Sequence, residues 1–318
     1  MNLATSYLGL RLHNPFVVGA SPLCDNVGIA RRLQDAGAAA VVMRSLFEEQ
    51  FSPSRVPASA AENIAASADY QFSPERYLRQ LAALKKHLHI PVIASLNGHH
   101  AGRWIDFSLE LEAAGADAIE LNFYQVVTDP GIAPDQVETE MLEVVGEISG
   151  SVRIPVAVKL SPYHASVTQL ALALELAGAA GLVIFNRFYQ PDVNVDTLDV
   201  QPQLRLSEPG ELLLRLRWLA ILSPHLRGSL AATGGVHSAE DAVKAFLTGA
   251  HAVQLVSVLL DRGPDFLTTL MTGLHAWMHR HGYDRIDEFR GALNLQRCAD
   301  PGAFERANYL RVLQSWHA

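Results

Sequence analysis

Four apolar runs in the chain each begin directly after a glycine that ends a helical pattern. The glycines stand in the phrases Ala36-Gly37-Ala38, Ala114-Gly115-Ala116, Ala177-Gly178-Ala179 and Thr248-Gly249-Ala250, and the runs that follow read AAVVM, DAIEL, AGLVIF and HAVQL. Glycine is common just past the end of a helix, and a short apolar run bounded by such a signal is typical of a buried strand. The pattern therefore predicts four helix-to-strand transitions.

Four further apolar runs extend this alternation of helix and strand. Two begin at Ile90-Pro91-Val92 and Ile154-Pro155-Val156, and two shorter runs cover residues 16–19 and 230–232. Strands that are apolar on both faces belong to a parallel sheet that is covered on both sides. Eight alternating units favour a closed barrel over a doubly wound sheet. We therefore predict an α/β fold in which residues 1–318 form a single (β/α)8 TIM barrel, with a mostly helical tail after Arg280.

Two connections are too long to be simple turns. Residues 44–73 follow the second predicted strand and residues 185–209 follow the sixth, and both stretches contain prolines and many small or polar residues. Long loops at the C-terminal ends of barrel strands usually cover or shape an active site. The alternative is that the two loops are decorations or contacts between subunits.

Residues 229–260 read as a strand, a Gly-Gly turn, a helix and another strand. Gly234 and Gly235 lack a β-carbon and let the backbone come close to a ligand, while Ser238 is a good N-cap for the helix that follows. In (β/α)8 barrels the loops after the last two strands commonly bind phosphate. The turn therefore predicts a phosphate site, although a tight turn without a ligand fits the same residues.

Composition narrows the class of protein. The chain has 318 residues, of which 49% are hydrophobic and 18% charged, and its formal net charge of −8 shows no basic stripe that would favour nucleic acid as a partner. Two cysteines, Cys24 and Cys298, cannot form a zinc or iron–sulfur site by themselves, so we expect no metal and a reduced, cytoplasmic setting. No apolar run is long enough to span a bilayer and the N-terminus lacks the features of a secretory signal, so no membrane partner is expected.

Polar residues stand at the C-terminal ends of six predicted strands, where they would form a ring around one mouth of the barrel. They are Ala20-Ser21, Arg44-Ser45, Asn97, Asn122, Lys159 and Asn186-Arg187. Side-chain amides can donate and accept hydrogen bonds, so they suit a ring whose edge carries both donors and acceptors. A lysine can stabilise negative charge that develops on such a ring. With the phosphate turn on the far side, the ring predicts a planar heteroaromatic cofactor that has a phosphate tail.

Over most of its length the chain resembles the dihydroorotate dehydrogenase family of FMN-binding barrels. The resemblance lies in Asn14-Pro15 before Ala20-Ser21, the V-K-L-S-P segment that contains Lys159, Glu120-Leu121-Asn122, Asn186, the Thr233-Gly234-Gly235-Val236 turn, and Val253-Gln254 with Ser257. It implies an FMN held by Ala20, Ser21, Arg44, Ser45, Asn97, Asn122, Lys159 and Asn186, with its phosphate on Gly210, Gly234, Gly235, Val256 and Ser257. It also implies oxidation of dihydroorotate to orotate in pyrimidine biosynthesis, with Asn122 and Asn186 holding the pyrimidine, and a homodimer.

The chain departs from the family at three places. Gln125 stands where family members carry the Cys or Ser that acts as base, and a neutral amide cannot accept a proton near neutral pH. Arg44 replaces a lysine, and the family's substrate loop is replaced by a different sequence over residues 61–75. Tyr124 is an alternative proton donor beside the cofactor, or a packing residue, and Arg187 is either a carboxylate ligand or half of a surface ion pair.

Three functions remain open. The first is an FMN-dependent oxidoreductase acting on CH–CH bonds, with dihydroorotate or a related small cyclic substrate. The second is a lyase in which Lys159 forms a Schiff base with a phosphorylated substrate. The third is a flavin-binding accessory protein without the family chemistry. No electron acceptor can be read from the chain, so an electron-transfer partner protein could supply it, and Lys159 itself could instead close the barrel top with a salt bridge.

Overall fold

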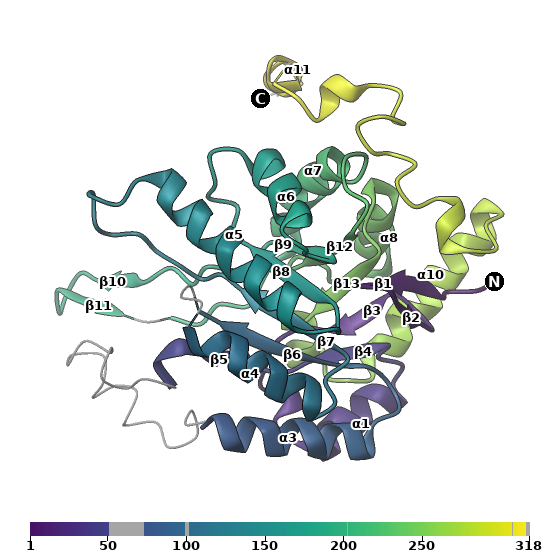
Figure 1. Ribbon diagram of the computed structural model, residues 1–318. Coiled ribbons are helices and arrows are strands. Elements are labelled where there is room, and N and C mark those ends of the chain that lie inside the picture. Colours follow the sequence, from purple (N-terminus) through teal and green to yellow (C-terminus); the bar gives the residue numbers. More distant parts are fainter. Residues whose placement is uncertain (51–72, 99–101, 202, 307, 316–318) are drawn as a thin grey trace.

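Eight parallel strands form a closed barrel in the computed structural model, which describes residues 1–50, 73–98, 102–201, 203–306 and 308–315 (Figure 1). In their order around the barrel they are β3 (Phe16–Val18), β4 (Ala40–Val42), β6 (Val92–Asn97), β7 (Ala118–Asn122), β8 (Val156–Leu160), β9 (Gly181–Ile184), β12 (Ser229–Thr233) and β13 (Ala252–Leu255), which pairs again with β3. A short strand β5 (Leu46–Phe47) extends the pairing of β6 beyond the end of β4. The predicted (β/α)8 fold is confirmed.

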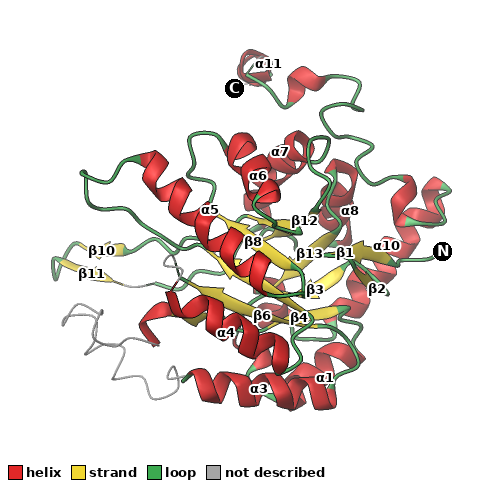
Figure 2. Cartoon of the chain, viewed as in Figure 1, coloured by secondary structure: helices red, strands yellow, loops and turns green. Residues whose placement is uncertain are grey.

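Helices surround the barrel and separate its strands (Figure 2). They are α1 (Val27–Asp35), α3 (Pro74–His87), α4 (Gly102–Ala113), α5 (Pro134–Ser151), α6 (Val167–Leu176), α7 (Leu212–Leu222), α8 (Ala239–Thr248), α9 (Ser257–Arg262), α10 (Phe266–His281) and α11 (Asn308–Gln314). The helix after the Gly-Gly turn begins as predicted, because the Ser238 side chain accepts a hydrogen bond from the Asp241 N–H.

The glycines that were predicted to end helices do so. Gly37, Gly115, Gly178 and Gly249 all have positive φ. At Gly249 a β-carbon would lie 2.3 Å from Ser223 Cβ, so both the backbone conformation and the space require glycine. Helix-ending glycines were therefore a sound guide to where the strands begin.

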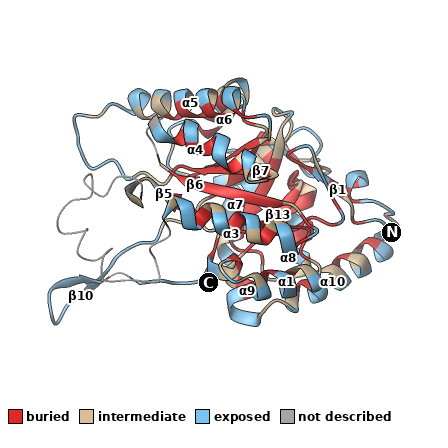
Figure 3. Cartoon of the chain, turned by 60° about the horizontal axis from the view of Figure 1, so that its bottom comes forward, coloured by how far each residue is buried: buried red, intermediate tan, exposed pale blue. Residues whose placement is uncertain are grey.

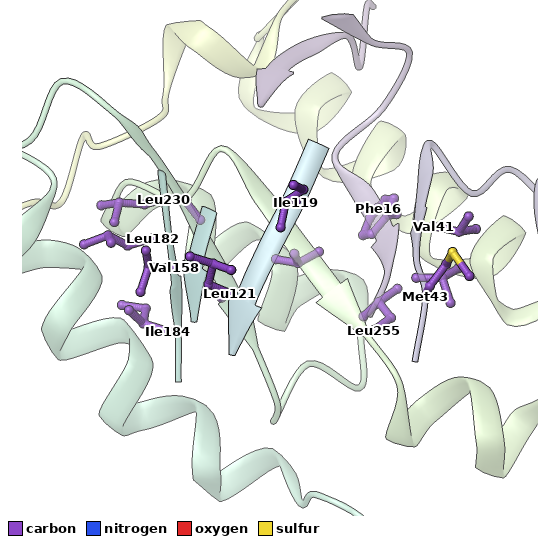
Figure 4. Packing of buried hydrophobic residues seen from close by; sticks show 14 of the residues in the cluster. Phe16, Val41, Met43, Ile119, Leu121, Val158, Leu182, Ile184, Leu230 and Leu255 are labelled. Carbon is purple, nitrogen blue, oxygen red and sulfur yellow. The ribbon is translucent and has the colours of Figure 1, made fainter. Parts of the chain in front are cut away.

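The interior of the molecule is divided into two apolar layers. Bulky side chains on the outward face of the strands pack against the helices, and Figure 4 shows members of this outer cluster that include Phe16, Ile119 and Leu255. The inward face carries mostly small residues such as Ala118, Ala157 and other alanines. Side chains alternate along a strand, so the same short runs fill both layers, and Figure 3 shows the barrel strands β6, β7 and β13 as buried.

An N-terminal hairpin that the sequence analysis did not predict closes one end of the barrel. This end, called here the lower end, is where the strands begin, and the mouth is where they end. Its strands are β1 (Thr5–Tyr7) and β2 (Leu10–Leu12), and Tyr7 and Leu8 belong to the inner apolar cluster. The Leu8 N–H donates to Ser229 Oγ over 2.9 Å at the start of β12. Figure 1 shows this hairpin at the end of the barrel opposite to the hairpin of β10 (Asp192–Asn194) and β11 (Asp199–Gln201).

The structure describes only one of the two long connections nearly in full. Most of the first, and most of the predicted replacement over residues 61–75, lie outside the described residues, while residues 73–75 form the N-cap and the start of α3. The second contains the β10–β11 hairpin at the mouth end of the barrel. The C-terminal tail runs along the outside of the barrel as predicted, since the N–H groups of Leu293 and Leu295 donate to carbonyls of Leu247 and Ala220.

His251 links the start of two barrel strands to the N-terminal strand and should make stability depend on pH. Its Nδ1 accepts a hydrogen bond from the Leu230 N–H over 3.0 Å, and its carbonyl accepts one from Thr5 Oγ1. Burial, with help from the positive charge of Arg290, lowers the pKa of His251 from 6.5 to about 4.

Between these two values the unfolded chain binds a proton that the folded chain does not, so the free energy of unfolding should fall as pH is lowered from about 6.5 to about 4, by at most about 3 kcal/mol. His251→Asn keeps an acceptor but cannot titrate, so it should flatten the dependence. Urea unfolding at several pH values checks this, with His281→Asn at the exposed C-terminal end of α10 as the control. Equal acid sensitivity of His251→Asn and wild type would remove His251 as the cause.

Candidate functional site

A cavity of about 420 Å³, called here the first cavity, opens at the C-terminal ends of the barrel strands. Fourteen of the predicted site residues line it, namely Ala20, Ser21, Arg44, Ser45, Asn97, Asn122, Tyr124, Lys159, Asn186, Arg187, Gly234, Gly235, Val256 and Ser257. They meet because the strands are parallel and in register, as in the pairing of Asn122 with Lys159. The structure thus brings together most of the polar ring expected at the mouth.

Two predicted residues do not line the first cavity. Gly210 is exposed in a short 3-10 helix, Pro209–Glu211, and the cavity is lined instead by Ser207, which is buried. Pro209 begins this helical turn, and the turn carries Gly210 away from the mouth. Gln125 lines a neighbouring second cavity, which is described below, and it does not face the first.

Glycine is required at the predicted phosphate turn. Gly234 and Gly235 have φ of 85° and 81°, and a β-carbon on Gly235 would lie 2.4 Å from the Leu212 backbone nitrogen. Arg215 braces the turn from beneath, because its Nε donates to the Thr233 carbonyl over 2.9 Å and its Nη1 to the Glu211 carbonyl over 2.7 Å. The turn is therefore held open toward the cavity.

Ser207 joins this turn to the start of helix α9. Its Oγ accepts a long hydrogen bond of 3.3 Å from the Gly235 N–H, and its own N–H donates to Ser257 Oγ over 2.9 Å. Backbone N–H groups and hydroxyls gathered at glycines are well suited to phosphate oxygens. Ser207 was missed by the sequence analysis, in which the family resemblance implied Gly210 at the phosphate instead.

Amides and hydroxyls form a chain across the floor of the first cavity. Asn186 Nδ2 donates to Asn122 Oδ1 over 2.5 Å, Asn122 Nδ2 lies 3.4 Å from Ser45 Oγ, and Ser45 Oγ lies 2.8 Å from Ser95 Oγ. Asn97 Nδ2 is buried and has no hydrogen-bond partner among the residues that the structure describes. A buried donor without a partner is costly, so this amide is suited to an acceptor on a bound molecule.

Lys159 lies at the centre of a buried charged group. Its Nζ is 3.6 Å from Glu120 Oε1, and the two side chains are 8% and 1% exposed. Gln254 Nε2 donates to Glu120 Oε2 over 2.5 Å, and below them burial and the nearby Glu120 carboxylate raise the pKa of Tyr7 far above its ordinary value. Lys159 therefore both forms the alternative salt bridge and lines the cavity, where its charge can act on a ligand.

The two arginines at the mouth are held by acidic partners. Arg44 forms an ion pair with Asp25, whose pKa is raised by burial although Arg44 opposes the shift. Arg187 Nη2 donates to the Leu206 carbonyl over 2.9 Å and lies 3.3 Å from Glu211 Oε1. Both side chains still line the first cavity, each as one half of an ion pair.

Tyr124 packs against a neighbouring ring and also lines the first cavity, while its role as a proton donor stays a prediction. Its ring stacks on Phe188 with centroids 4.2 Å apart, and its hydroxyl accepts a hydrogen bond from the Tyr189 N–H over 3.1 Å. It lines the first cavity and also the second. Its hydroxyl is thus fixed in position beside both.

Neither a metal-binding cluster nor a membrane-spanning helix is found in the described part of the chain. No group of three or more His, Cys, Asp or Glu side chains there could hold a metal ion. None of the described helices has the length and apolar character needed to cross a membrane.

Comparison with known proteins places this architecture in a family. The family model described as dihydroorotate dehydrogenase matches residues 2–278. The chain is 26% identical over 302 residues to "Dihydroorotate dehydrogenase B (NAD(+)), catalytic subunit" of Thermoplasma volcanium, covering 91% of this chain and 98% of that protein. It is 28% identical over 298 residues to the protein of the same name from Methanosarcina acetivorans, covering 89% and 93%. It is 25% identical over 325 residues to the chloroplastic dihydropyrimidine dehydrogenase (NADP(+)) of Arabidopsis thaliana, covering 91% and 76%.

The closed parallel barrel with a polar cavity at its C-terminal mouth defines an α/β barrel of the class that binds small molecules at that face. Because the matched model spans most of the sequence, the chain belongs to the dihydroorotate dehydrogenase family. It is an oxidoreductase of the dihydroorotate dehydrogenase type.

Proposed function

We propose that the chain is an FMN-dependent oxidoreductase that acts on a CH–CH bond of dihydroorotate or of a related small cyclic substrate. The observation that carries the proposal is the first cavity, where a glycine turn, a buried lysine and an unpartnered buried amide converge. The Gly234-Gly235 turn suits a phosphate, and Asn97 Nδ2 suits an acceptor on a planar ring. Three cationic side chains and no carboxylate line the cavity among the described residues, which suits an anionic ligand.

The roles of the residues follow from their positions. Gly234, Gly235, Ser207 and Ser257 would hold the phosphate of FMN, and Asn97, Asn122 and Asn186 would hold the ring and the substrate. When bound, FMN supplies the acceptor for the two electrons that leave the substrate with one of its hydrogens. Lys159 places a positive charge beside the ring, where negative charge develops on reduction.

The proton that leaves the substrate needs an acceptor other than Gln125. Gln125 is an amide and does not line the first cavity, whereas Tyr124 does. The Tyr124 hydroxyl, which accepts a hydrogen bond from the Tyr189 N–H, would act as a relay that takes the substrate proton while it passes its own proton to solvent.

The Lys159 lyase has less support than the oxidoreductase. Lys159 Nζ lies 3.6 Å from Glu120 Oε1 in a buried ion pair, and the amine would have to give up this partner to attack a carbonyl. A flavin-binding accessory protein fits the site better than the lyase does, because it needs the cofactor site but not the missing family base.

We extend the proposal to a cytoplasmic homodimer that functions in pyrimidine biosynthesis and passes electrons to a partner protein. Both cysteines are free thiols, which is compatible with a reducing compartment. The β10–β11 hairpin carries the directly paired and exposed Val193 and Val200, which give a candidate surface for another subunit. The dimer, the compartment and the partner stay predictions.

A visible absorption spectrum of the purified protein, followed by anaerobic addition of dihydroorotate, tests the proposed function. We expect a flavin spectrum that bleaches. A flavin spectrum that persists would favour the accessory protein or another substrate, and no flavin after incubation with FMN would overturn the proposal in favour of the lyase.

A further inference from the structure

A second cavity, of about 690 Å³, adjoins the first at the barrel mouth. It is bounded by the segment after β7, the start of α5, and the segments after β8 and β9. Tyr124 and Tyr189 line both cavities, so the two share a wall. A volume of this size is typical of a site for a small organic molecule.

Aromatic rings form one side of the second cavity. Tyr124 and Phe188 are stacked with an interplanar angle of 9°, and Tyr163 meets Phe188 edge-on with centroids 5.4 Å apart. Phe123 and Met141 are buried and contribute apolar surface. These side chains favour a planar, largely apolar occupant.

The charges around the second cavity exclude an anion. Glu138 is the one carboxylate in its lining, and no lysine or arginine lines it among the described residues. His164 Nδ1 is 3.7 Å from Glu138 Oε1, and burial lowers the pKa of His164 although Glu138 opposes the shift, so the imidazole is neutral near pH 7. The first cavity, with Arg44, Lys159 and Arg187, has the opposite character.

Gln125 supplies the polar group of the second cavity. It is only partly exposed, and its side-chain amide makes no hydrogen bond to the described residues. An amide presents a donor and an acceptor side by side, and a ring that carries neighbouring N–H and C=O groups would satisfy both. Ser161 is buried close by, where its Oγ accepts from the Tyr163 N–H over 3.2 Å.

We propose that the second cavity binds an uncharged planar ring with adjacent N–H and C=O groups, recognised by the Gln125 amide. This inference rests on the proposed function, because the ring is the part of the substrate that extends beyond the reacting ring in the first cavity. A substrate that fills both cavities is then larger than dihydroorotate, which would occupy the first cavity alone. The glutamine at the position of the family base is a specificity residue, and it performs no proton transfer.

Methionine methyl NMR can test this without any activity. The chain has five methionines, and Met141 lines the second cavity, so its ¹³C-labelled methyl signal reports occupancy there. The probe is quinolin-2(1H)-one, an uncharged bicyclic lactam, added to the protein as purified. We expect a saturable shift of the Met141 signal, assigned with Met141→Leu.

Gln125→Leu should weaken probe binding about tenfold, the effect of losing about one good pair of hydrogen bonds. The matched control is Gln136→Leu on the exposed face of α5, which should leave the binding unchanged. Quinoline-2-carboxylate, which carries a negative charge, should not shift Met141.

No shift of Met141 with the lactam, equal affinity in Gln125→Leu, or an equal shift with the carboxylate would each overturn the inference. These outcomes are independent of the flavin spectrum, which tests the proposed function. If the protein binds the lactam through Gln125 but holds no flavin, the second cavity is confirmed as a binding site and the proposed function fails.

Discussion

Replacing Lys159 by alanine should slow the reduction of bound flavin by about 10²- to 10³-fold, the usual effect of removing one group that stabilises developing negative charge. The same change should make the midpoint potential of the bound flavin more negative, because a positive charge beside the ring is lost. Anaerobic stopped-flow absorbance measures the rate, and dithionite titration with a reference dye measures the potential. The potential does not depend on knowing the substrate.

Loss of Lys159 also leaves Glu120 buried without its cation. Removing one partner of a buried pair costs about 3–5 kcal/mol, so the single variant could lose flavin through instability. The double variant Lys159→Ala, Glu120→Gln removes both charges and should restore thermal stability while the reduction stays slow. A normal rate and potential in a folded double variant would remove Lys159 from the mechanism.

Gly235→Val should eject the flavin, with binding weakened at least about tenfold. The added side chain meets Leu212 backbone atoms, the nearest at 2.4 Å, and φ of 81° is unfavourable for valine, so the turn must move away from the phosphate. The flavin-to-protein ratio after gel filtration, with far-UV circular dichroism to check the fold, gives the measurement.

Gly282→Val is the matched control for backbone strain. Gly282 has φ of 72° at the end of α10, and nothing lies within 4 Å of an added β-carbon. This variant should lose roughly 1–2 kcal/mol of stability and keep its flavin. Stoichiometric FMN in Gly235→Val would sink the phosphate assignment.

The barrel could be predicted because its signals are local. Each helix-ending glycine, such as Gly249, marks a turn within a few residues, and the strand that follows is uniformly apolar. The β1–β2 hairpin could not be predicted, because its strands have only three residues each. It is held in place by a hydrogen bond to Ser229, which lies far along the chain. Such contacts leave no periodic pattern in the sequence.

Site residues at the ends of strands could be predicted from the sequence, whereas site residues in loops could not. Asn97, Asn122 and Lys159 are inward-facing residues of strands, so the strand assignments alone bring them to one mouth. Glu120 could have been assigned to Lys159, because it lies two residues before Asn122 on the same face of β7.

Loop residues were different. Gly210 and Gln125 lie in segments without a period, where a single turn decides which cavity a side chain lines. Local sequence does not determine such a turn, so their orientation needed the structure.

The closed lower end of the barrel makes the site a blind well. Tyr7 and Leu8 seal the interior from below, and Lys159 and Glu120 lie between that seal and the mouth. Anything that reaches the lysine must therefore enter and leave by the same opening. A bound product has to depart through this opening before the next molecule can reach the lysine.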